Sequence, residues 1–206
     1  MATLTYPGGR LFVPARMQIW CEPNVLMSQA PLTKSTRRLS LTGAPWRMVT
    51  AFAPCASRAD VDDQAQREAW FNYLGGRENL AALWHFKRPA PLGTMRGSPT
   101  IASTAAKGAT SIAITTTAGA TVRAGDMLGM GSGGQLVQVR EDATADGAGA
   151  MTVNIVPKLR AQVAAATAVI WDKPTATFMC LSAGVPIGYS PGIGDGFTVE
   201  WIESYS

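Results

Sequence analysis

Charged residues are scarce in this 206-residue chain, and histidine occurs only once. Asp, Glu, Lys and Arg make up 16% of the sequence, below the roughly 25% that is typical of soluble domains. Because protein–protein interfaces are poor in charge, this scarcity favours a subunit that buries surface against neighbours over simple compositional drift. The longest basic runs are Arg37-Arg38 and Lys87-Arg88. No dedicated nucleic-acid-binding surface, and no sequence-specific nucleic-acid binding, is therefore expected.

The sequence also lacks the patterns of disulfide, metal and membrane proteins. Cys21, Cys55 and Cys180 are too few and too widely spaced to make a metal site with His85, so no metal is predicted and the thiols are expected to be reduced. We expect His85 to be a hydrogen-bonded core or interface residue. The N-terminus has no apolar leader and no apolar run approaches ~20 residues, so neither a signal peptide nor a membrane span is expected.

Motifs of catalysis are missing as well. The chain has no H-E-x-x-H, no G-x-S-x-G and no phosphate-binding loop ending in Gly-Lys-Ser/Thr. The glycine-rich residues 129–134 open no helix, and we interpret them as a hairpin loop. Two of Glu141, Asp142, Asp146 and Asp172 could form a hydrolase site, and Asp142 with Asp146 could bind calcium. Solvated loop carboxylates are the simpler interpretation, and we predict a protein that is not an enzyme and has no cofactor.

What the sequence does contain is a series of short β-strands. Outside the middle of the chain, strand-like runs occur at residues 10–20, 37–41, 46–52, 79–86, 175–182 and 197–203. Proline at position 14 interrupts the first run. Residues 42–45 are a turn signal that would join the second and third runs as a hairpin. In the third run Trp46, Met48 and Phe52 share one face, and they are expected in the core.

One helix is expected between Ser57 and Leu74. Ser57 is a suitable N-cap, and acidic residues follow it in the first turn, where the helix dipole favours negative charge. Gly75-Gly76 then ends the helix. A repeat of four residues predicts the face that packs against a sheet, which contains Val61, Ala65, Ala69 and Tyr73, with Trp70 and Leu74 beside them.

Composition changes near Gly97, after which Ala, Thr and Gly dominate and large aromatic residues are rare until Trp171. Short strands are expected at residues 110–116, 126–130, 135–141, 150–156 and 168–171. Five strands at this spacing predict a small β-barrel of the OB or SH3-like kind. The lack of aromatic residues argues against a site for single-stranded nucleic acid or carbohydrate in this module.

These observations predict a mainly β fold with one helix, of the α+β class. Residues 1–96 and 174–206 would form a β-sandwich flanked by the helix. Residues 97–173 would form the small barrel, inserted into a loop of the sandwich.

The order of several motifs in residues 27–97 resembles the distal tail proteins of phages with long, non-contractile tails. The motifs are Ser28-Gln29-Ala30-Pro31-Leu32, Leu41-Thr42-Gly43-Ala44-Pro45-Trp46, the helix, Leu74-Gly75-Gly76-Arg77, Trp84-His85-Phe86 and Pro91-Leu92-Gly93-Thr94-Met95-Arg96-Gly97. Residues 128–160, which end in Val156-Pro157-Lys158-Leu159-Arg160, are similar to the same family. The Gly75-Gly76 pair and Trp84-His85 depart from the family pattern.

The resemblance implies a tail-tube-like β-sandwich whose copies form a ring, usually a hexamer, between the tail tube protein and the tail hub protein. An inserted barrel would carry receptor-binding or fibre proteins, and the whole would be a virion component at the tail tip, or baseplate, assembled in the host cytoplasm. A peripheral receptor- or carbohydrate-binding tail appendage is the alternative. The candidate interface residues are aromatic residues near the termini and one basic pair, namely Tyr6, Trp20, Arg37, Arg38, Tyr189 and Tyr205.

Overall fold

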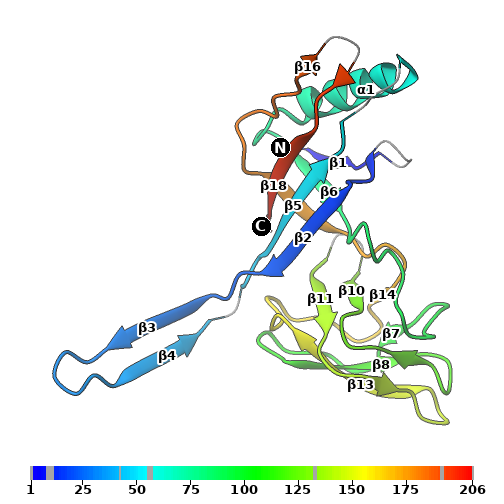
Figure 1. Cartoon of the computed structure of the whole chain (residues 1–206). Helices are drawn as coiled ribbons and strands as arrows, with labels where there is room; N and C mark the ends of the chain where they lie inside the picture. Colours follow the sequence, from blue (N-terminus) through cyan, green and yellow to red (C-terminus); the bar gives the residue numbers. More distant parts are fainter. Residues whose placement is uncertain are drawn as a thin grey trace. The chain divides into compact units, whose positions relative to one another are not determined.

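The computed structural model describes residues 2–7, 12–41, 43–54, 58–131, 134–190 and 193–205. These residues are mainly β and contain a single helix, as predicted (Figure 1). The chain divides into two compact units. The first, which we call the sheet unit, contains Met1–Trp20, Trp46–Lys87 and Thr175–Ser206. The second, the barrel unit, contains Cys21–Pro45 and Arg88–Pro174.

The sheet unit is built around one six-stranded sheet with the strand order β1-β6-β15-β18-β5-β2. In this order the strands are Thr3–Thr5, Leu80–Leu83, Ala176–Cys180, Phe197–Glu203, Trp46–Phe52 and Arg16–Cys21. The C-terminal strand β18 lies between β15 and β5 and pairs antiparallel with both. Both ends of the chain therefore contribute to the same sheet, because β1 joins its far edge in parallel with β6.

Helix α1 (Arg58–Leu74) covers one face of this sheet. The ring of Phe71 lies 5.8 Å from that of Phe52 and 5.4 Å from that of Phe197, measured between centroids. The predicted helix is confirmed, although Ser57 and Cys55 lie outside the described residues. The surface of the sheet beneath the helix contains Trp46, Met48 and Phe52, as predicted.

The predicted packing face of the helix is wrong for Ala65, Ala69 and Tyr73, which are exposed, and correct for Leu74, which is fully buried. The other buried positions among the described side chains of the helix are Gln64, Arg67 and Phe71, and the side chain of Val61 lies outside the described ones. Phe71 and Leu74 offer far more apolar area than two alanines, so the helix turns this stripe to the sheet and buries two polar side chains with it. Arg67 lies over the ring of Phe52 at 5.6 Å, and its Nη1 donates to Oε1 of Gln64 at 3.2 Å.

The second large sheet of the expected sandwich is not among the described elements of this unit. Beside the large sheet there is only the small pair of β16 (Tyr189–Ser190) and β17 (Ile193–Gly194), next to the helix. The sheet face opposite the helix carries half-buried and exposed side chains instead. The described part of the sheet unit is thus a helix layered on one sheet.

The barrel unit contains a second six-stranded sheet, with the order β14-β10-β11-β13-β8-β7. These strands are Val169–Ile170, Met127–Met130, Leu136–Val139, Ala150–Val156, Ser111–Thr115 and Thr100–Ile101. Its two edges approach one another, since Thr100 bridges Ala168 and the amide of Val169 donates to the carbonyl of Pro99 at 2.9 Å. The sheet is therefore a nearly closed barrel, with β9 (Thr121–Val122) and β12 (Ala143–Thr144) as a small additional pair.

The second segment of the barrel unit begins at Arg88, nine residues before the composition changes. The buried carboxylate of Asp126 accepts hydrogen bonds from the amides of Leu92 (2.7 Å) and Gly93 (3.2 Å), and Met95 is fully buried in the barrel core. Residues 88–96 were assigned to the sandwich because the composition changes only near Gly97. Their backbone is instead anchored by a residue 34 positions further on.

The N-terminal hairpin differs from the prediction. Strand β4 (Thr36–Ser40) pairs with β3 (Val25–Gln29), which the sequence analysis missed, and β5 pairs with β18. Trp46, Met48 and Phe52 of β5 are buried in the six-stranded sheet, whereas β4 carries two adjacent arginines, one of which would face that core and lose its hydration. Residues 21–45, which were assigned to the sandwich, form no strand of the large sheet beyond Cys21.

Candidate assembly surface

The β3–β4 hairpin, which we call the assembly hairpin (residues 25–40), exposes its apolar side chains. Every residue of β3 is exposed, and the relative exposure is 59% for Leu26, 65% for Met27 and 95% for Leu32 in the turn. Backbone hydrogen bonds from Lys34 to Ala30 and from Ala30 to Ser35 close that turn. The hairpin is therefore ordered by its own backbone, while its side chains have little to pack against.

The two faces of the hairpin follow from its register. Leu26 lies opposite Leu39, and Ser28 lies opposite Arg37, so these side chains share one side, together with Leu41 two residues further on. We call this side the leucine face.

The opposite side, which we call the methionine face, carries Val25, Met27 and Arg38. Both sides thus combine apolar residues with one arginine. Neither is covered.

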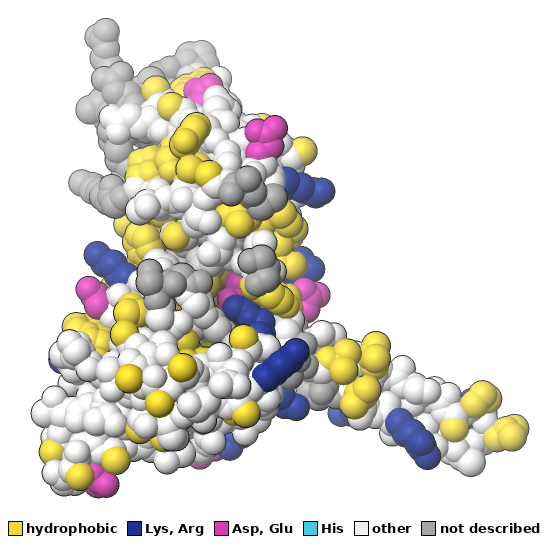
Figure 2. All heavy atoms as spheres, turned by 180° about the vertical axis from the view of Figure 1, so that it is seen from behind, with side chains coloured by type: hydrophobic (Ala, Val, Ile, Leu, Met, Phe, Trp, Pro, Cys, Tyr) yellow, Lys and Arg dark blue, Asp and Glu magenta, His cyan; other side chains and the backbone are white. Residues whose placement is uncertain are grey.

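The hairpin is basic throughout. From Pro23 to Ala59 the sequence contains no Asp or Glu, while the hairpin carries Lys34, Arg37 and Arg38. Figure 2 shows hydrophobic and basic side chains, and no acidic ones, along it. The guanidinium groups of Arg37 and Arg38 make no hydrogen bond or ion pair with the described residues.

Exposed apolar residues on an isolated hairpin indicate a binding surface. A two-stranded hairpin alone is marginally stable in water at best. Burying a leucine side chain is worth about 1.5–3 kcal/mol, so covering Leu26 and Leu39 would stabilise the hairpin substantially. Monomeric proteins rarely expose contiguous apolar surface of this kind.

A second uncovered surface lies on the sheet unit, opposite the helix. We call it the open face and define it by Arg47, Val49, Ala51, Met179, Glu200 and Ile202. Strand pairing places Glu200 beside Val49, and Ile202 beside Met179. Glu200 is exposed, and its carboxylate has no hydrogen-bond or ion-pair partner in the described part of the chain.

The predicted interface residues have different environments. Arg37 and Arg38 lie on opposite faces of the assembly hairpin, and Trp20 is exposed on the edge strand β2. Tyr189 and Tyr205 are exposed as well, and the hydroxyl of Tyr189 donates to Oε2 of Glu68 on the helix at 2.7 Å. The structure brings only the two arginines together on one element.

Tyr6 is not an exposed interface residue, and that prediction is wrong. Its side chain is only 3% exposed, and its hydroxyl donates to the carbonyl of Phe12 at 2.8 Å. Its ring centroid lies 5.0 Å from those of Trp70 and Phe86. Burial raises the pKa of Tyr6 well above its usual value. Tyr6 therefore belongs to the aromatic core of the sheet unit, where the hydrogen bond to Phe12 satisfies its buried hydroxyl.

The residues of the assembly hairpin that sequence reasoning missed are those of β3. Val25, Leu26 and Met27 form a short apolar run next to Pro23, and the turn after it contains Pro31. A signal was present, because a short apolar run bounded by Pro23-Asn24 and by a proline-containing turn indicates a strand. The stronger turn at residues 42–45 drew the pairing to the wrong partner.

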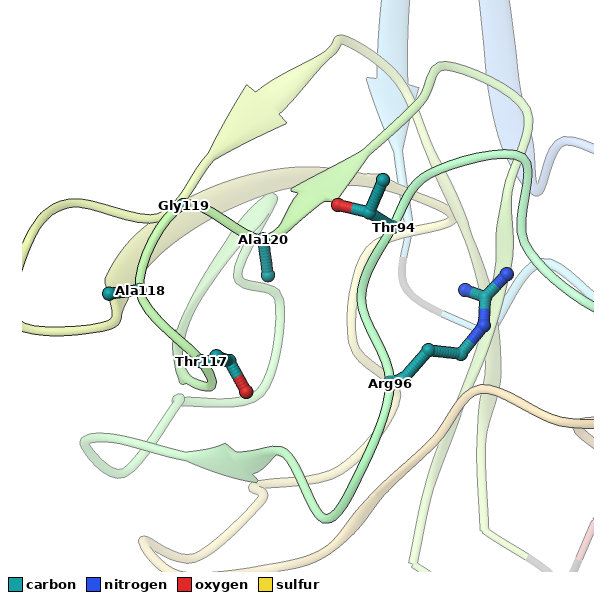
Figure 3. Close-up of a pocket in the computed structure, with 6 residues that line it drawn as sticks. All are labelled: Thr94, Arg96, Thr117, Ala118, Gly119 and Ala120. Carbon is teal, nitrogen blue, oxygen red and sulfur yellow. The ribbon is translucent and has the colours of Figure 1, made fainter.

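The barrel unit contains two adjacent hollows, of about 300 and 220 Å³, which share Arg96 and Thr117. Threonine hydroxyls line much of them, and Figure 3 shows the guanidinium of Arg96 pointing away from the larger one. That guanidinium donates to the carbonyls of Gly93 (2.9 Å) and Met95 (2.6 Å) and lies 5.0 Å from the Trp171 ring centroid. Arg96 thus covers the ring of Trp171, and the residues that line the hollows include no aromatic side chain that could stack on a sugar or a base.

The loop carboxylates of the barrel unit stabilise turns and do not converge on a site. Asp146 accepts hydrogen bonds from the amides of Ala148 and Ala150. The Ala124 amide and then Arg123 hold the pKa of Asp142 below its usual value, and hydrogen bonding by Arg140 lowers the pKa of Glu141. Within the described residues, no group of His, Cys, Asp and Glu side chains is arranged to hold a metal ion.

No family model matches the chain, and no curated protein matches it. Among the described residues, no helix combines the length and the apolar character needed to cross a membrane.

Proposed function

We propose that this protein is a structural subunit of a bacteriophage tail tip, of the distal tail protein kind. Its copies form a ring, of six in the family that it resembles, between the tail tube protein and the tail hub protein. It works by holding its neighbours in place, without catalysis, cofactor or metal. It belongs to the virion and assembles in the host cytoplasm.

The observation that carries the proposal is the assembly hairpin. Its exposed leucines and methionine would lower the solubility of a free monomer. They would stabilise the protein only when another molecule covers them. A hairpin and the surface that receives it differ in shape, so contacts between copies would be head-to-tail. Head-to-tail contacts produce a closed ring when the rotation between successive copies closes.

The organisation of the chain supports the same function. Both chain ends contribute strands to one helix-backed sheet, and the barrel residues 88–174 are inserted between them. In the family that the sequence resembles, a tail-tube-like β-sandwich flanked by a helix forms the ring, and a small inserted barrel carries receptor-binding or fibre proteins. We assign the first role to the sheet unit and the second to the barrel.

The test compares the full chain with a variant that lacks the hairpin. The amide of Leu41 donates to the carbonyl of Asn24 at 2.8 Å, so a Gly-Gly turn can replace residues 25–40 without moving either end. Light scattering and electron microscopy should show rings for the full chain and monomers for the variant. A full chain that stays monomeric at all concentrations would contradict the proposal, and a position away from the tail axis in the virion would favour the receptor-binding appendage.

A further inference from the structure

The outer edge of β3, on the side away from β4, is formed by the peptide groups of every second residue. At one end of the hairpin, the amide of Ala30 donates to the carbonyl of Ser35 at 2.9 Å. At the other end, the amide of Leu41 donates to the carbonyl of Asn24 at 2.8 Å. Because bonded and non-bonded pairs alternate along an antiparallel ladder, the residues between them follow in turn. Those of β3 whose N–H and C=O groups point away from β4 are Val25, Met27 and Gln29.

This outer edge is accessible and lacks the usual protection. All three residues are exposed, and their outward peptide groups make no hydrogen bond within the described part of the chain. Proteins commonly protect a free edge with charge, proline or a bulge. β4 carries Arg37 and Arg38, whereas β3 contains no charged residue and no proline, and its register is unbroken. The outer edge of β3 is therefore open to the addition of a further strand.

The charge of the hairpin indicates the chemistry of that strand. The three charged residues of the hairpin are all basic, and residues 23–59 contain no Asp or Glu. A second hairpin of the same chain would bring three more positive charges alongside, whereas an acidic strand would be attracted. The exposed Leu26 and Met27 lie on opposite faces of β3, so apolar side chains of an added strand gain a neighbour on either face.

We propose that the outer edge of β3 receives an extended, acidic segment of another protein, which adds a third strand to the hairpin. The outward peptide groups bond the backbone of that segment, and its carboxylates lie beside the basic residues of the hairpin. The inference goes beyond the ring function and does not depend on it. An edge is distinct from the two faces, so a strand can join it while the leucine face contacts a neighbouring copy.

Proline substitution tests the edge while keeping the hairpin's own hydrogen bonds. The amide of Met27 points outward, so Met27→Pro removes an N–H that no bond to β4 uses. Met27→Ala is the matched control, because it shortens the same side chain and keeps the N–H. Thr36→Pro changes the outer edge of β4 in the same way, because Thr36 lies opposite Gln29.

The probe is a labelled short peptide in which glutamate alternates with valine, and its binding to the full chain is measured by fluorescence anisotropy. The chain should bind this peptide and leave the matching lysine–valine peptide unbound. Met27→Pro should weaken the binding about tenfold or more, and Met27→Ala and Thr36→Pro less than about threefold. The amides of Val25, Met27 and Gln29 should exchange fast in the free chain and slowly with the acidic peptide bound.

The exchange of the inward amides shows whether a variant still forms the hairpin. Leu26 and Ser28 belong to the bonded pairs, so their amides should exchange more slowly than those of the outer edge. If Met27→Pro abolishes this difference, Val25→Pro replaces it, because the first position of a strand tolerates proline best.

Several results would overturn the inference. These are no binding of the acidic peptide up to about 1 mM, equal binding of the acidic and basic peptides, and equal binding by Met27→Pro and Met27→Ala. Slow exchange of the outward amides in the chain alone would also contradict it. If that protection disappears on dilution, the edge belongs to a second copy, and if it persists, to a strand of the same copy. Binding of anionic lipid vesicles but not of the peptide would assign the hairpin to a membrane surface.

The ring function and the strand addition fail separately. Rings whose β3 edge binds no peptide would overturn only this inference. Peptide binding by a chain that stays monomeric at every concentration would overturn only the ring function.

Discussion

The indole N–H of Trp201 donates to the hydroxyl of Thr50 at 3.0 Å, in the core between the C-terminal strand and β5. The two residues are 151 positions apart in the sequence, and both are buried. The same pair of strands is joined again where the amide of Trp46 donates to the carboxylate of Glu203 at 3.0 Å. The polar groups of this core are thus satisfied only when the C-terminal strand β18 has paired with β5.

Replacing Thr50 with valine should therefore destabilise the sheet unit. The substitution keeps the shape and leaves the indole N–H buried without its acceptor, at a cost of about 1–3 kcal/mol. Urea unfolding followed by tryptophan fluorescence measures this unit, because five of the six tryptophans lie in it. The exposed Thr198→Val is the control, and an equal loss in both variants would show that the hydrogen bond contributes nothing.

The glycine pair that ends the helix should respond asymmetrically. Both glycines have positive φ, 61° at Gly75 and 60° at Gly76. A Cβ at Gly76 would lie 2.2 Å from the carbonyl oxygen of Ala183, whereas at Gly75 it would meet the flexible side chain of Glu78. Gly75→Ala should cost about 1 kcal/mol, and Gly76→Ala clearly more, because backbone must move. Similar unfolding midpoints would contradict the close approach of residue 183.

Asp126 should determine the stability of the beginning of the barrel unit. Its carboxylate accepts hydrogen bonds from the amides of Leu92, Gly93 and Arg123. Asp126→Ala should cost about 3 kcal/mol or more, since hydrogen bonds to charged groups contribute about 1.5–3 kcal/mol each. Amide exchange at Leu92 and Gly93 should accelerate, and the exposed Asp172→Ala serves as the control. Unchanged exchange would show that other contacts hold this segment.

Sequence reasoning succeeded where a strand is long and has one buried face. The runs at residues 46–52, 150–156 and 197–203 coincide with β5, β13 and β18. It failed where two faces of a helix, or two partner strands, compete for the same packing position. The helix buries Phe71 and Leu74 with two polar residues instead of its alanine stripe, and the pairing of β4 depends on which strand reaches it in space.

The candidate site was predictable only in part for the same reason. Arg37 and Arg38 were singled out as a basic pair, and their exposure agrees with that interpretation. The opposite faces that they occupy depend on the register with β3, which was missed. Tyr6 was mistaken for an exposed residue because a tyrosine near a terminus looks exposed until the aromatic rings around it are known.

The apolar side chains of the hairpin should control assembly. Changing both Leu26 and Leu39 to threonine removes apolar area while keeping β propensity, and should weaken association by at least about tenfold, because each leucine is worth about 1.5–3 kcal/mol when buried. The pair Val25→Thr and Met27→Thr removes apolar area from the methionine face in the same way. Light scattering across a dilution series measures both pairs, and association that neither pair weakens would contradict the role of the hairpin.

The most direct test of the account is a cryo-electron microscopy map of the purified, assembled protein that shows where residues 25–40 lie. We expect closed rings in which each hairpin packs on the neighbouring copy and Leu26 and Leu39 are buried. A solitary molecule, or a ring in which both faces of every hairpin remain in solvent, would contradict the account.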